Sequence, residues 1–241
     1  MKLVRANDPA GGVSRTPSAR AAVDEGLRAY MLQVYNYMGA GLAVTGLVAY
    51  FAAISGVYAS IASTLWIWPV IFAPLAFVLV LSFGIERISV RMAQLLFWVF
   101  SAAMGLSLAS IFLVFTGASI ARVFFITAAT FGAMSVYGYT TKSDLSHIGS
   151  FLFMGLIGII IASMVNIFIG SSAVQFAVSI IGVIVFVGLT AWDTQQIKDD
   201  YYDHDLGDVA GKKAIFGALQ LYLDFINLFN MLLQLFGERD K

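Results

Sequence analysis

Long apolar stretches, interrupted by short groups of charged residues, make up most of this chain. Seven stretches approach or exceed about 20 residues, the length that a helix needs to cross the hydrocarbon core of a bilayer. Residues 29–85 contain no charged side chain, and residues 92–197 contain only Arg122, Lys142, Asp144 and Asp193. We therefore expect an all-α integral membrane protein with seven transmembrane helices. The predicted spans are 31–54, 66–85, 93–115, 119–140, 149–169, 173–196 and 214–236.

Composition supports the membrane setting. Apolar residues make up 60% of the chain and charged residues 12%, against about 25% charged residues in soluble domains. The formal net charge is zero, so charge gives no reason to expect nucleic acid as a partner. The chain has no cysteine, which excludes disulfides and thiolate metal sites. We expect the lipid bilayer as a partner and no cofactor, and the sequence does not identify protein partners.

The distribution of basic residues predicts the orientation. With a cytoplasmic N-terminus, eleven of the 14 Lys and Arg residues fall inside, as the positive-inside rule requires. Residues 1–28 are polar and are expected to be a disordered cytoplasmic tail preceding a transmembrane domain over 29–241. An organellar transit peptide is an alternative for this segment, although Asp8, Asp24 and Glu25 are atypical of one.

Polar residues of the seventh span recur at helical spacing. Intervals of three or four residues place them on one helical face, as expected of a helix that is enclosed by others and lines a polar path. Hydrogen bonding between helices is the alternative reason for such a stripe. The stripe consists of Lys213, Gly217, Gln220, Asp224, Asn227, Met231 and Gln234, of which Gln220, Asn227 and Gln234 are the candidate pore-lining residues.

Two aspartates stand alone in the last two predicted spans. An ionised side chain at the centre of a bilayer costs at least about 2.5–3.5 kcal/mol, so such a residue usually faces a partner or a water-filled path. Asp193 lies about 7 Å of helical rise inside the interface before Lys198, and Asp224 lies about 12 Å past Phe216 on an antiparallel helix. We expect the two carboxyl groups to meet and to share one proton, which makes them a candidate pH sensor.

An acidic loop is predicted between these two spans, over 198–213. A solvated surface loop is the preferred interpretation, because the spacing lacks the glycine and glutamate of a calcium-binding EF-hand. The loop would still concentrate cations near a pore mouth. Its acidic residues are Asp199, Asp200, Asp203, Asp205 and Asp208.

Two motifs carry a resemblance to a known family. AWDTQQIK at 191–198 and LYLDFINLF at 221–229 resemble the end of the sixth helix and the centre of the last helix of the Bax inhibitor-1-like family, also called transmembrane Bax inhibitor motif proteins. The similarity extends over about residues 28–236. It implies two three-helix layers around a central C-terminal helix, and a pH-sensitive calcium leak. The resemblance to bacterial members also implies a bacterial inner membrane, with an organellar membrane as the alternative.

The resemblance assigns roles to particular residues. The aspartate pair of the bacterial members matches Asp193 and Asp224, and the arginine that latches the pair matches Arg87, with Arg91 as a substitute. A guanidinium bridging two carboxylates would stabilise their ionised form, so protonation should release the latch. Transient Ca²⁺ contact with Asp193 and Asp224, assisted by Asn227, agrees with the preference of this ion for oxygen ligands. Anchoring at the membrane interface is the alternative role for Arg87.

Three other function classes remain open at this stage. A proton-coupled secondary transporter would also use a protonatable aspartate within the membrane, although no inverted repeat is visible. An intramembrane aspartyl protease would use two aspartates as acid and base, but its Gly-x-Gly-Asp element is absent. A membrane protein that serves only as a docking surface is the third. We expect the chain not to be an enzyme.

Overall fold

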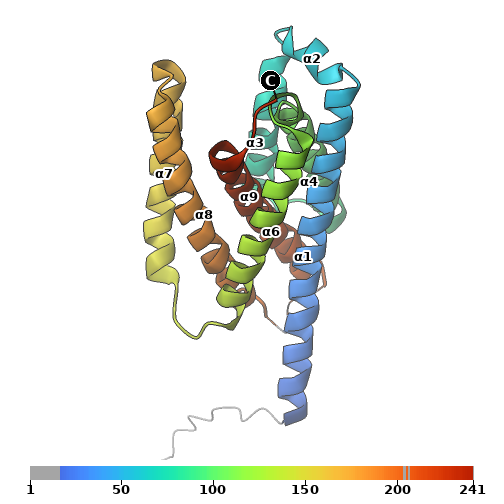
Figure 1. Ribbon diagram of the computed structural model, residues 1–241. Helices are drawn as coiled ribbons and strands as arrows, with labels where there is room; N and C mark the ends of the chain where they lie inside the picture. The colour runs from blue at the N-terminus through green and yellow to red at the C-terminus, as the bar shows by residue number, and fades with distance from the viewer. Residues whose placement is uncertain (1–16, 203–204, 206, 241) are drawn as a thin grey trace, which may run out of the picture.

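The computed structural model describes residues 17–202, 205 and 207–240, and its secondary structure is almost entirely helical (Figure 1). Seven helical segments of the described chain are long and apolar enough to cross a membrane, which confirms the predicted spans. The segments are α1 (Pro17–Ile54), α3 (Ile67–Gly84), α4 with the short α5 (Val90–Leu108 and Ile111–Val114), α6 (Gly117–Thr140), α7 (Ser146–Ile169), α8 (Ser172–Asp199) and α9 (Gly207–Phe236), with α2 (Val57–Ala62) in a connection.

Helix α1 begins earlier than the sequence prediction allowed. Residues 17–28, expected as part of a disordered tail, are helical, whereas the first 16 residues lie outside the described part of the chain. The run after Pro17 is rich in alanine and arginine, which favour helix, and proline is well tolerated at a first helical position. The pattern of apolar spans does not predict this extension, because four of its 12 residues are charged.

The seven long helices form two groups around α9. Helices α1 and α3 each pack against α4, whereas α6 and α7 each pack against α8. The last helix, α9, contacts α1, α3 and α4 from the first group and α6 and α8 from the second. Figure 1 shows α9 in dark red between α8 on the left and α1 on the right. The predicted architecture of two three-helix layers around a central C-terminal helix is therefore confirmed.

The side chains of α9 form the centre of the core. The residues Leu221, Tyr222 and Leu228 are completely buried, and Phe97 and Phe100 of α4 make edge-to-face contacts with the Tyr222 ring. Within the second group, α6 crosses α8 so closely that a Cβ atom at Gly138 would collide with the carbonyl oxygen of Ala191. Small residues of this kind allow membrane helices to approach without a hydrophobic driving force between them.

Candidate functional site

The aspartates predicted from the sequence are buried together at the interface between α8 and α9. Asp193 is 7% exposed and Asp224 is 5% exposed, and their carboxyl groups lie within hydrogen-bonding range of one another. Within the described residues, the Oδ2 atom of Asp224 is buried with no hydrogen-bond partner. Two carboxyl groups in contact cannot both remain ionised without strong repulsion, so a proton held between them suits this geometry.

Hydroxyl-bearing side chains surround the Asp193 end of α8. Thr190 and Thr194 are wholly buried on either side of Asp193, and the Thr194 hydroxyl hydrogen-bonds to Ser135 of α6 at 3.4 Å. The Thr190 hydroxyl donates to the carbonyl oxygen of Phe186 at 2.7 Å, within its own helix. Gly217 of α9 packs against Ile197, which brings the two helices close near the aspartates. Buried polar side chains are therefore concentrated on α8 around Asp193, within a largely apolar bundle.

The connection between α8 and α9 is shorter than the predicted loop. Asp199 ends α8 and Asp208 lies in the first turn of α9, so only residues 200–206 connect the helices. A carboxylate in the first turn is favourable because it faces the positive end of the helix dipole. The predicted start of α9 is too late, because the first turns of this helix carry the charged residues Asp208, Lys212 and Lys213. Asp203 lies outside the described residues.

Lysine side chains form hydrogen bonds between elements at the end of the bundle where α8 leads into α9. Lys213 donates to Asp205 Oδ2 at 2.7 Å and to the carbonyl oxygen of Asp200 at 2.9 Å. Lys198 donates to the carbonyl oxygen of Tyr139 at 2.9 Å, which joins α8 to α6. Within the described chain, no group of three or more His, Asp or Glu side chains is placed to hold a metal ion.

The candidate latch arginine lies at the same end, in the turn after α3. Arg87 is exposed and makes no ion pair with Asp193 or Asp224 in this structure. Arg91, the substitute, is exposed in the first turn of α4. Lys212 of α9 donates to the carbonyl oxygen of Glu86 at 3.2 Å, so the turn that carries Arg87 is already tied to the central helix.

The three candidate pore-lining residues of α9 differ in their surroundings. Gln220 and Asn227 are half-buried, and the Asn227 side chain donates to the carbonyl oxygen of Leu223 in its own helix at 2.8 Å. Gln234 is exposed and accepts a hydrogen bond from Gln175 of α8 at 3.0 Å. The Ser179 hydroxyl, which donates to the carbonyl oxygen of Gln175 at 2.9 Å, lies 3.2 Å from the same Gln234 oxygen. Only Gln234 therefore makes an observed hydrogen bond to a neighbouring helix.

A buried hydrogen-bond network on another face of α9 was missed by the sequence analysis. Thr45 of α1 donates to the carbonyl oxygen of Ser101 at 2.8 Å and lies 2.6 Å from the Tyr222 hydroxyl. Because Thr45 uses its proton on Ser101, Tyr222 must donate to Thr45. A lone threonine in a span without charges gives no signal in the sequence, since only the fold shows which helix it faces.

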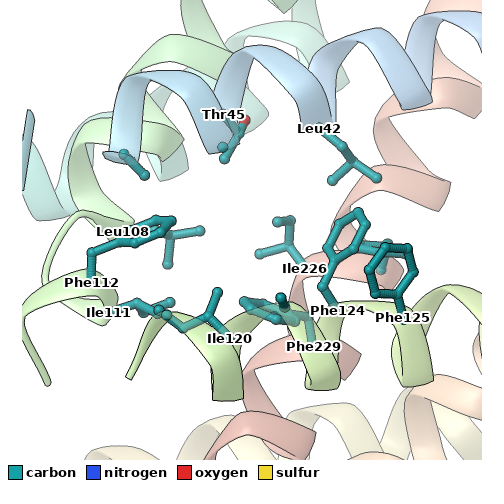
Figure 2. A pocket seen from close by; sticks show the side chains of 15 residues that line it. Leu42, Thr45, Leu108, Ile111, Phe112, Ile120, Phe124, Phe125, Ile226 and Phe229 are labelled. Carbon is teal, nitrogen blue, oxygen red and sulfur yellow. The ribbon is translucent and has the colours of Figure 1, made fainter. Parts of the chain in front are cut away.

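An apolar cavity of about 270 Å³ lies next to this network, between α1, α6 and α9. Figure 2 shows side chains such as Leu42, Phe124 and Phe229 pointing into it, with Thr45 at its edge. A cavity lined in this way offers a cation almost no oxygen ligand, and a bare ion would pay a large desolvation cost there. It is therefore a poor candidate for an ion path.

Comparisons with known proteins agree with the fold and its membrane setting. Residues 27–241 match the family model described as inhibitor of apoptosis-promoting Bax1. The chain is 52% identical over 218 residues to the inner membrane protein YbhL of Escherichia coli, covering 89% of this chain and 93% of that protein. It is 48% identical over 225 residues to protein RP147 of Rickettsia prowazekii, covering 93% and 95% of the two chains. A Caulobacter vibrioides protein is 43% identical over 248 residues, covering 96% of this chain and 98% of its own.

Proposed function

The chain belongs to the Bax inhibitor-1 family of membrane proteins, and we propose that it is a pH-sensitive calcium leak of a bacterial inner membrane. The observation that carries the proposal is the buried contact between Asp193 and Asp224 on two neighbouring membrane helices. Carboxyl groups inside a membrane are costly, and for that reason they usually mark an ion or proton path. The name of the E. coli relative supports the choice of membrane.

Gating follows from the proton that the two carboxyl groups share. At higher pH the proton leaves, and the ionised pair needs a cation close by to offset its repulsion. We assign this role to Arg87, which would have to swing inward from its exposed turn at the end of α3. Protonation at lower pH weakens the attraction to the guanidinium and favours the open path.

The choice of Ca²⁺ rests on the family resemblance together with oxygen chemistry. Carboxylate oxygens and amide oxygens such as that of Asn227 are the ligands that a hard cation prefers. With only two carboxylates, the contact would be transient, as conduction requires, because an ion must leave the site as readily as it enters. The N-terminus is placed in the cytoplasm by the positive-inside rule, which puts the aspartates in the cytoplasmic half of the membrane.

The test is Ca²⁺ flux into proteoliposomes that contain only this protein, measured from about pH 8 to pH 6, where a shared proton is expected to titrate. Flux should rise as the pH falls, and both Asp193→Asn and Asp224→Asn should flatten that rise. The double variant should add little to either single change, because both remove the same coupled site. Proton-driven accumulation of a solute, in place of a passive leak, would favour a secondary transporter.

Asp144→Asn is the matched control. Asp144 lies in the connection between α6 and α7, where hydrogen bonds from the side chain and backbone of Ser146 lower its pKa. A carboxyl group with a lowered pKa is ionised throughout the tested range, so this substitution should leave the pH profile unchanged. Wild-type profiles in both Asp193→Asn and Asp224→Asn would refute the aspartate pair as the sensor.

A further inference from the structure

A polar groove lies at the opposite end of the bundle from the lysine contacts, where α7 ends, α8 begins and α9 ends. The groove has a volume of about 330 Å³, and its polar lining comes from Ser163 and Asn166 of α7, Gln175 of α8 and Gln234 of α9. Polar side chains from three membrane helices seldom gather where only lipid could meet them, because lipid cannot satisfy their hydrogen bonds. In the groove Gln175 donates a hydrogen bond to Gln234, and the space of about 330 Å³ beside these side chains has room for water.

The groove continues the polar stripe that carries Asp224. Met231 also lines it, and Gln234, Met231, Asn227 and Asp224 lie on one face of α9 at intervals of three, four and three residues. From Gln234 to Asp224 the rise along the helix is about 15 Å. The groove and the aspartates are therefore joined by a single face of the central helix.

Met231 lies on α9 between Gln234, which lines the groove, and Asp224. It packs against Gly182 of α8 so closely that a Cβ atom there would come within 2.8 Å of Met231 Cγ and 2.9 Å of Sδ. Glycine leaves room for the thioether, and methionine is flexible enough to fill such a gap or to leave it.

We infer that this groove is the second mouth of the cation path and that Met231, seated on Gly182, is the constriction between it and the aspartates. The inference rests on the proposed function and assigns further residues to the same cation path. Neutral amide and hydroxyl oxygens would receive a cation that keeps part of its water shell. Hydrophobic constrictions close membrane pores by excluding water.

Chemical blocking tests the groove as a mouth. The chain has no cysteine, so single-cysteine variants carry no background reactivity. A positively charged, membrane-impermeant methanethiosulfonate should modify Gln234→Cys from the C-terminal side and lower Ca²⁺ flux toward that of empty liposomes. Ser172→Cys, exposed at the same end but outside the groove lining, should be modified without loss of flux. Full modification of Gln234→Cys with unchanged flux would overturn the assignment of the mouth.

Accessibility tests the constriction without any ion flux. Thr190→Cys replaces a wholly buried residue on α8, beyond Gly182 in the direction of Asp193. Thr190→Cys should react with the reagent as slowly as the buried reference Ser101→Cys. Adding Met231→Ala should raise its reaction rate toward that of Gln234→Cys, whereas the volume-conserving Met231→Leu should not. Met164→Ala, a methionine exposed on α7, is the matched control and should leave the rate unchanged.

The two readouts separate the failure of this inference from the failure of the leak. A reaction rate of Thr190→Cys that does not respond to Met231→Ala would overturn the constriction, whatever the flux measurements show. The wild-type protein could show no Ca²⁺ flux while Thr190→Cys reacts with the reagent only when Met231→Ala is added. That result would refute the leak, and Met231 would still be the barrier between the groove and the aspartates. If the wild type does conduct Ca²⁺, equal flux in wild type and Met231→Ala, despite new access to Thr190→Cys, would also contradict Met231 as the barrier to ions.

Discussion

Helices α7 and α9 both cross the membrane, but they differ in composition and in surroundings. In α7, the more apolar of the two, 11% of the residues in the most apolar 18-residue stretch are buried, whereas in α9 the corresponding share is 67%. In a soluble protein the order would be reversed, because water would drive the more apolar helix inside. In this protein the helix with the aspartate, asparagines and glutamines occupies the centre.

The difference follows from the solvent that each helix faces. Lipid tails are as apolar as leucine, so α7 loses nothing by exposing Ile161, Ile167 and Phe168 to them. The polar groups of α9 would remain unsatisfied in lipid, so that helix must be enclosed by protein. A low hydropathy in an otherwise convincing span therefore points to the helix at the centre of such a bundle.

The largest effect expected is the difference in stability between truncating a buried leucine and truncating a lipid-facing isoleucine. Leu228→Ala in α9 removes a side chain with no exposed area, whereas Ile161 in α7 is 56% exposed. Leu228→Ala should cost about 2 kcal/mol, the low end of the range for core truncations, because the lost contacts and not transfer from water dominate in a bilayer. Ile161→Ala should cost much less. Reversible unfolding in one detergent measures both, and equal losses would contradict the comparison.

The aspartates should differ in their effect on the maximal flux, because only one belongs to the central helix. Asp224→Asn should lower the Ca²⁺ flux measured at acid pH several-fold, since it removes a carboxylate from the stripe that leads to the groove. Asp193→Asn imitates the protonated pair and should leave the path open at neutral pH. The measurement is initial flux at matched protein incorporation. Identical maximal fluxes in the two variants would remove any separate role of α9 in ion passage.

The smallest effect expected is that of Arg87→Gln, because the latch contact is not formed in this structure. If the guanidinium holds the ionised pair closed, Arg87→Gln should raise the Ca²⁺ flux at neutral pH and leave the flux at acid pH unchanged. Arg91→Gln, which alters an equally exposed arginine in the adjacent helix, is the matched control. Equal neutral-pH fluxes of Arg87→Gln and the wild type would leave Arg87 only as an interface anchor.

Much of the fold could be predicted from the sequence, because the composition of a segment by itself indicates whether that segment can cross a membrane. Asp193 and Asp224 could also be singled out, because each is a lone charged residue in an apolar segment and burying a charge there is costly. The start of α1 at Pro17 and that of α9 at Gly207 could not be found in this way, because helices that extend beyond the bilayer become polar. The contacts of Thr45 with Tyr222 and of Met231 with Gly182 join distant parts of the chain and require the three-dimensional structure.

The position of α9 along the chain has a consequence for biosynthesis. The helix at the centre of the bundle is the last of the seven spans to be translated, so six helices enter the membrane before the element that they surround. At about 5–20 residues per second, its 30 residues need roughly 1.5–6 s to be synthesised. During that interval the two groups of helices must remain far enough apart to admit a polar segment that lipid alone would reject. Assembly of this protein therefore ends with the insertion of its core.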